Sequence, residues 1–178
     1  MKSNKTVLIF LIKFFGTYIV LFLLYSIYLN LTQEKSAVFS CAPITKSVAK
    51  HSKVILDFVG YSSEIVQSEI ELSINLIVRG KPLARVIEGC NSISIIILFI
   101  AFIVAFSSTF KTTLFYIIFG SLLIYSINIV RIVIIAIALY EFPEYEHLLH
   151  NYLFPAIIYG VTFLLWFIWV RKFSKVKK

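Results

Sequence analysis

Long apolar stretches alternate with shorter polar ones along this chain. Four apolar stretches stand out, at residues 7–31, 92–106, 114–139 and 152–170. An α-helix rises ~1.5 Å per residue, so about 20 apolar residues cross a hydrocarbon core of ~30 Å. The pattern therefore predicts an all-α integral membrane protein with about four transmembrane helices, built as a single membrane domain over residues 1–178.

Residues 32–89 form a long polar insertion between the first two apolar stretches. Within it, residues 42–61 mix apolar residues with lysines at a helical spacing, and Pro43 suits the first turn of a helix. Residues 71–87 alternate polar and apolar side chains on both sides of a turn at residues 79–82. We expect a small amphipathic helix and a β-hairpin that leads the chain into the second span.

Basic residues flank the apolar stretches. The chain has 17 Lys and Arg against 9 Asp and Glu, a formal net charge of +8, and is 60% hydrophobic. Lys and Arg beside membrane spans mark the cytoplasmic side and contact lipid headgroups. Both termini and the loop at Lys111 are basic, whereas residues 140–150 contain no Lys or Arg. This predicts cytoplasmic termini, an insertion on the outer side and no nucleic-acid partner, because no basic face with interleaved aromatic residues is visible.

Several chemically versatile residues fall at the outer ends of the predicted spans. Cys90 precedes the second span, and both His147 and His150 precede the fourth. Arg131 lies inside the third span, ~13 Å below its outer end at ~1.5 Å per residue. Asn128 lies one turn before Arg131, on the same helix face. The predicted topology therefore collects a thiol, a guanidinium and an imidazole in the same leaflet.

This combination favours a nucleophilic cysteine. A lone cysteine usually packs as a small hydrophobe, but a neighbouring guanidinium or imidazolium stabilises the thiolate. A charged side chain near mid-membrane costs roughly 2.5–3.5 kcal/mol, so Arg131 is expected to be paired, hydrated or functional unless it snorkels to the interface. Cys90 with a histidine is a minimal nucleophile and base pair, and Arg131 can hold an oxyanion.

Other interpretations remain open from the residues alone. In one, the protein is a non-catalytic membrane subunit, a small transporter or an export accessory, in which Arg131 binds an anionic ligand. In another, the only two cysteines, Cys41 and Cys90, form a disulfide. His147 and His150 could share a helical face toward a metal, but no third ligand is evident, so we expect neither a metal nor a cofactor.

Three short motifs occur in a distinctive order. They are Glu-Gly-Cys-Asn at residues 88–91, Asn-Ile-Val-Arg at residues 128–131 inside a later span, and a histidine just before the last span. Together they resemble the exosortase/archaeosortase family of membrane cysteine transpeptidases, and the layout is most similar to exosortase F of the Bacteroidota. The resemblance implies a multi-pass protein of the bacterial inner membrane with its active site facing the periplasm.

The resemblance also implies roles for residues. Cys90 would be the nucleophile, Arg131 its essential partner and His150, which leads directly into the last span, the acid/base, with His147 as the reserve. Asn128 and Asn91 would support them. The substrates would be exported proteins with a C-terminal sorting signal: a short motif, a transmembrane helix and a basic tail. A dedicated membrane partner protein, and resolution of the acyl-enzyme by an amine acceptor or by water, would follow from the same resemblance.

Overall fold

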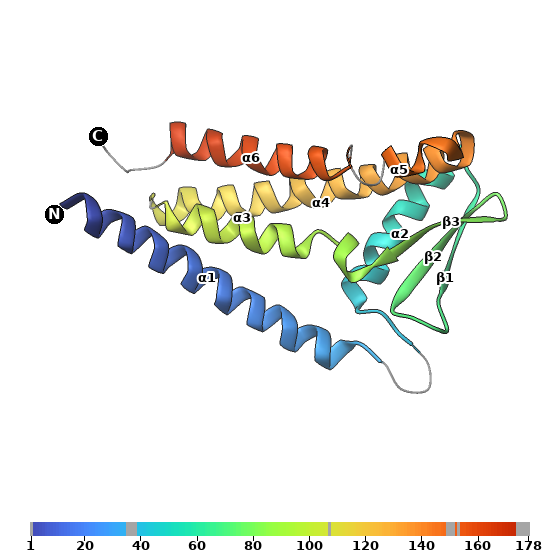
Figure 1. Cartoon of the computed structure of the whole chain (residues 1–178), viewed down its shortest axis with the longest axis horizontal. Helices are drawn as coiled ribbons and strands as arrows, with labels where there is room; N and C mark the ends of the chain where they lie inside the picture. Colours follow the sequence, from blue (N-terminus) through green and yellow to red (C-terminus); the bar gives the residue numbers. More distant parts are fainter. Residues whose placement is uncertain (1, 35–38, 107, 149–151, 153, 174–178) are drawn as a thin grey trace.

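The structure, a computed structural model, describes residues 2–34, 39–106, 108–148, 152 and 154–173. Its helices are α1 (Lys2–Thr32), α2 (Pro43–Phe58), α3 (Ile93–Ala105), α4 (Phe110–Glu141), the short α5 (Glu146–Leu148) and α6 (Phe154–Lys172). Its strands are β1 (Ser63–Gln67), β2 (Ser73–Val78) and β3 (Lys81–Ile87). Figure 1 shows α1, α3, α4 and α6 running lengthwise at one end of the molecule, with α2 and the sheet at the other.

Within the described part of the chain, three helices are long and apolar enough to cross a membrane. They are residues Lys5–Thr32 of α1, all of α4, and residues Pro155–Lys172 of α6. The predicted second span is also a helix, α3, but it has 13 residues and is therefore about 20 Å long. Length and composition thus support a mostly helical membrane protein, and α3 stands out as its shortest apolar helix among these four.

Aromatic side chains hold α3, α4 and α6 together. Their shared core contains the buried residues Phe99, Ile103, Ile124, Leu165 and Trp169. α1 lies outside this core and packs against α3, where the Phe10 ring stands 4.8 Å from that of Phe106. Most of the remaining surface of α1 is apolar and exposed, as expected for a helix that faces lipid.

Among the glycines, Gly120 is the one most closely approached by another helix. A Cβ atom added there would lie 2.3 Å from Cζ of Phe99, a fully buried side chain. We expect Gly120→Ala to destabilise the bundle by about 1–3 kcal/mol through overpacking. Gly16→Ala on α1 is the matched control, because nothing lies within 4 Å of the added Cβ. Thermal unfolding in detergent, followed by tryptophan fluorescence, measures both; equal shifts would contradict the expectation.

A three-stranded antiparallel sheet with the order β1-β2-β3 forms the other end of the molecule. β2 and β3 lie where the hairpin was predicted, but their turn comprises only Arg79 and Gly80, both with positive φ (49° and 79°). A right-handed sheet twist favours such a turn, so β3 begins at Lys81, inside the predicted turn. The sequence analysis did not predict β1, which has only five residues.

A second core joins α2, the sheet and the C-terminal half of α4. Val48 and Leu56 of α2, Leu76 of β2, Val86 of β3 and Ile132 of α4 are all buried in it. α4 is therefore longer than the predicted span at 114–139, and it contributes to both cores. The polar insertion packs along one helix of the bundle instead of extending away from it (Figure 1).

The turn of the hairpin is fastened to the end of α4. The guanidinium of Arg79 lies 4.8 Å from the centre of the Tyr61 ring and 5.3 Å from that of Tyr140. The Tyr61 hydroxyl donates a 3.0 Å hydrogen bond to Glu141. This bond to a carboxylate raises the pKa of Tyr61. The sheet is thus held to α4 at its tip as well as through the core.

Candidate functional site

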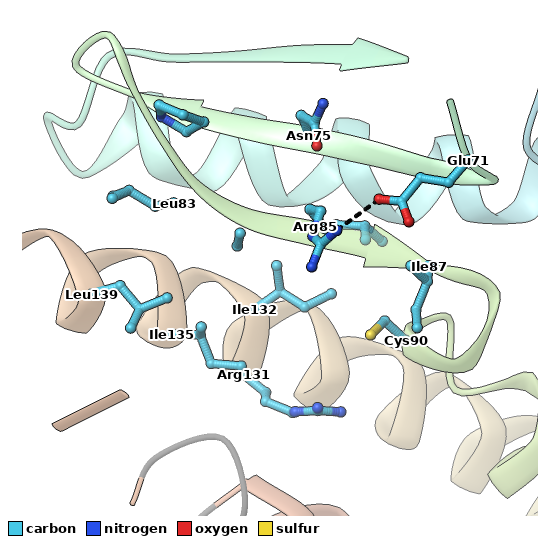
Figure 2. Close-up of a pocket in the computed structure, with 13 residues that line it drawn as sticks. Glu71, Asn75, Leu83, Arg85, Ile87, Cys90, Arg131, Ile132, Ile135 and Leu139 are labelled. Atoms are coloured by element: carbon cyan, nitrogen blue, oxygen red, sulfur yellow. Dashed lines mark hydrogen bonds and ion pairs between the residues drawn. The ribbon is translucent and has the colours of Figure 1, made fainter. Parts of the chain in front are cut away.

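A pocket of about 510 Å³ lies between β3 and α4. Residues 82–87 of β3 and Cys90 line one side, and Arg131, Ile132, Ile135 and Leu139 of α4 line the other. We call this pocket the β3 groove. Figure 2 shows the Cys90 thiol and the Arg131 side chain toward the same end of it, with Leu83 and Leu139 toward the opposite end.

One buried amide links Cys90 to Arg131. Nδ2 of Asn128 donates a 2.7 Å hydrogen bond to the backbone carbonyl of Cys90, across 38 positions of sequence. Oδ1 of the same side chain accepts a hydrogen bond of 3.3 Å from Nη1 of Arg131. Asn128 is 1% exposed, so these bonds use both ends of a side chain that water cannot reach. The structure therefore brings together Cys90, Asn128 and Arg131, as predicted.

Glu88 anchors the turn that carries Cys90. Cys90 ends a single 3₁₀ turn, Glu88–Cys90, between β3 and α3. Oε1 of Glu88 accepts a 3.0 Å hydrogen bond from the backbone N–H of Ala42, the residue that precedes α2. Oε2 accepts hydrogen bonds from Oγ1 of Thr45 and, at 3.1 Å, from Nδ2 of Asn91. A carboxylate here also complements the positive end of the α2 dipole.

Asn91 belongs to this anchor and does not line the groove. Besides Glu88, its Nδ2 donates a 2.7 Å hydrogen bond to the Tyr25 hydroxyl of α1, and its Oδ1 accepts one of 3.0 Å from the backbone of Ile93. We call Tyr25, Ala42, Thr45, Glu88 and Asn91 the Glu88 cluster. Asn91 was predicted as a supporting site residue. Its hydrogen bonds link α1, the Glu88 turn and the start of α3, and so they stabilise the turn that carries Cys90.

The groove also contains a charged pair that was not predicted from the sequence. Arg85 of β3 forms a 2.9 Å ion pair with Glu71, and both residues line the groove (Figure 2). Hydrogen bonds from Ser73 and Arg85 hold the pKa of Glu71 below its ordinary value. Both side chains are well exposed, so the ion pair adds little to the free energy of folding. Its main effect is to place charged groups at the groove. Their alternation with apolar neighbours was read only as a strand pattern.

Of the two candidate histidines, only His147 lies within the described residues. His147 lies on α5, is exposed and has its ring 6.1 Å from that of Tyr152. It does not line the β3 groove. His150, the predicted acid/base, lies outside the described residues. The structure therefore places the predicted nucleophile and arginine together, while the acid/base assignment stays a prediction.

The two cysteines are both free thiols, so they do not form the disulfide considered above. Cys41 is fully buried beside α2, and its backbone N–H donates a 3.2 Å hydrogen bond to Gln67. Burial raises the pKa of the Cys41 thiol. Cys90, in contrast, is partly exposed within the groove. Among the described residues, no cluster of three or more His, Cys, Asp or Glu could hold a metal ion.

No family model matches this sequence, and neither a curated protein nor a solved structure matches it.

Proposed function

We propose that this protein is a membrane-embedded enzyme that transfers acyl groups through a cysteine thioester. The observation that carries the proposal is the junction of Cys90, Asn128 and Arg131 at one end of a groove. A partly exposed thiol that lines one groove with a guanidinium has what a cysteine nucleophile requires: access for a substrate and a nearby cation. A cysteine that only fills space does not need either.

More particularly, we propose an exosortase-like protease or transpeptidase. The substrate would be an exported protein whose C-terminal sorting signal consists of a short motif, a transmembrane helix and a basic tail. The motifs at residues 88–91 and 128–131 support this class, since the fold joins them by the hydrogen bond from Asn128 to Cys90. The transmembrane helix of the substrate would lie in lipid beside the bundle and present the bond just outside the membrane.

The proposed position in the membrane follows from the length of α4. Lys111 would mark the cytoplasmic face, and a hydrocarbon core of ~30 Å takes up about 20 residues of helix, which ends near Arg131. The remaining turns of α4 would stand outside, covered by α2 and the sheet. Arg131 would then lie at the outer boundary and not ~13 Å below it, at a lower cost of insertion.

With α3 as a fourth, short span, both termini would lie in the cytoplasm and the groove would open to the periplasm of a bacterial inner membrane. The ends of α1 and α6 that carry the two termini lie at the same end of the molecule, which supports an even number of crossings (Figure 1). A short α3 is compatible with this because its N-terminal end follows Cys90 at the proposed boundary.

The proposed reaction has two steps. The Cys90 thiolate attacks the carbonyl carbon of the scissile peptide bond, and Arg131 stabilises the resulting oxyanion. As the C–N bond breaks, a histidine, His150 or in reserve His147, gives a proton to the leaving amine. The thioester on Cys90 is then attacked by an amine acceptor or by water, which restores the thiol.

Intact mass spectrometry tests this proposal. The chain is co-produced with an exported protein of the same genome that ends in an apolar helix and a basic tail. The wild type is expected to shorten that protein and to carry an acyl adduct on Cys90, whereas Cys90→Ser is expected to lose at least ~10³-fold of the cleavage. Cys41→Ala serves as the control and should cleave normally. Removal of the tail by Cys90→Ser at the wild-type rate would rule out the covalent mechanism.

A further inference from the structure

The β3 groove runs along a strand edge. Every residue from 82 to 87 lines it, although side chains of a strand point alternately to opposite faces. A pocket lined by consecutive residues follows the backbone of the strand, and this one also reaches Glu71 and Asn75, the β2 partner of Arg85. β3 is the last strand in the order β1-β2-β3, and within the described residues no strand pairs with its outer edge.

The register shows which backbone groups point to this edge. Ser73 of β2 is opposite Ile87, and the Ser73 carbonyl accepts a 3.0 Å hydrogen bond from Ser68, on the side away from β3. Bonded and non-bonded pairs alternate in an antiparallel ladder, so the N–H and C=O of Ile87 face away from β2. Arg85, two residues earlier, repeats this orientation. Both residues therefore offer a donor and an acceptor to the groove.

The opposite side of the groove suits an extended peptide. Ile132, Ile135 and Leu139 present apolar side chains along one face of α4. The six strand residues span about 20 Å at ~3.3 Å per residue, which accommodates up to about six residues of an extended chain. Arg85 and Arg131 outnumber the single carboxylate, Glu71, so the groove complements an acidic side chain.

We propose that this groove binds the peptide substrate as an added strand on the edge of β3, a known mode of peptide recognition. The inference rests on the proposed function and specifies how the substrate is held. β3 runs toward Cys90 and then into α3, and a substrate that approaches its own membrane helix from outside runs in the same direction. The pairing is therefore parallel, and the residues before the cleaved bond occupy the groove.

Peptidyl chloromethyl ketones test this inference on the full chain in detergent micelles. The Cys90 thiolate displaces chloride and forms a C–S bond, so the adduct is read by mass. Acetyl-valyl-alanyl-glutamyl-alanyl chloromethyl ketone is expected to label Cys90 at least tenfold faster than acetyl-alanyl chloromethyl ketone. A version with lysine in place of glutamate is expected to react several-fold more slowly. Equal rates for the long and short compounds would overturn the inference.

N-methylation locates the backbone contacts. Methylating the amides that face β3, which are alternate residues of the peptide, is expected to slow labelling at least tenfold, and methylating the others less than twofold. Arg85→Pro, which removes an edge N–H, is expected to slow the long compound more than Arg85→Ala, which removes the charge but retains that N–H. A uniform effect of methylation at all positions contradicts strand addition.

Iodoacetamide separates the two hypotheses. It needs no peptide binding, so Cys90 that reacts with iodoacetamide but gains nothing from peptide length refutes strand addition and leaves the nucleophile intact. Cys90 that reacts with neither reagent, while Cys41 reacts after unfolding, refutes the proposed function itself.

Discussion

A membrane-impermeant maleimide added from the outer side is expected to modify Cys90 and leave Cys41 untouched. Cys90 is partly exposed in the β3 groove, whereas Cys41 is fully buried and its pKa is raised by burial. A raised pKa means less thiolate at neutral pH, and a buried thiol reacts only after local opening. We expect Cys41 to react on the order of a hundredfold more slowly. Mass spectrometry of peptides measures both rates.

Four variants test which groups control the labelling of Cys90. Cys41→Ala should be labelled like the wild type, and Cys90→Ala should not be labelled until the protein is unfolded. Arg131→Gln should slow the labelling of Cys90 by about tenfold, because it removes the cation that lines the groove together with the thiol. Arg85→Gln is the matched control, because Arg85 lines the same groove but is paired with Glu71. Equal rates for the two arginine variants would favour the alternative in which Cys90 merely packs.

Glu88→Ala is expected to lower stability more than any other carboxylate substitution discussed for this chain. The Glu88 carboxylate accepts hydrogen bonds from Ala42, Thr45 and Asn91, all of which are at most 1% exposed. Each buried donor left without an acceptor costs ~1–3 kcal/mol, and Asn91 retains other acceptors, so the loss from the other two donors is expected to total about 2–6 kcal/mol. Thermal unfolding in detergent gives the shift.

Two further variants serve as comparisons for the stability of Glu88→Ala. Glu64→Ala removes an exposed carboxylate from β1 and should change the stability by less than ~0.5 kcal/mol. Glu88→Gln retains an acceptor oxygen and should fall between the two. Because Cys41 is next to Ala42, Glu88→Ala should also expose Cys41 to the maleimide. A Glu88→Ala protein as stable as the Glu64→Ala protein would show that the cluster does not hold the turn.

Much of the helical framework was predictable from local pattern. The apolar runs predicted α1, α4 and α6 because length and hydrophobicity alone set them apart, and Pro43 marked the start of α2. The neighbourhood of Cys90 and Arg131 was predictable from topology, since the ends of successive antiparallel spans meet on one side of a membrane.

Other features depended on long-range contacts that no local pattern records. Apolar residues such as Ile132 and Ile135 have the same sequence pattern whether lipid or a sheet covers them, so the pattern could not show that this part of α4 packs beneath β3. Glu88 and Thr45 are 43 positions apart in the sequence. Their hydrogen bond depends on how α2 packs, and no local pattern predicts it. β1 has only five residues and lies among polar ones, so its alternation was too short to predict a strand.

In the proposed function, the shared helix α4 would fix the distance between the membrane and the site of cleavage. The same rigid rod carries Lys111 at its base, Arg131 beside the thiol and Leu139 at the far end of the groove. Under the proposed function, the height above the lipid at which a bond is cut would be set by the number of helical residues between Lys111 and Arg131. One added turn would raise the site by ~5.4 Å, close to the length of two extended residues. The enzyme would select its bond by distance from the membrane as well as by sequence.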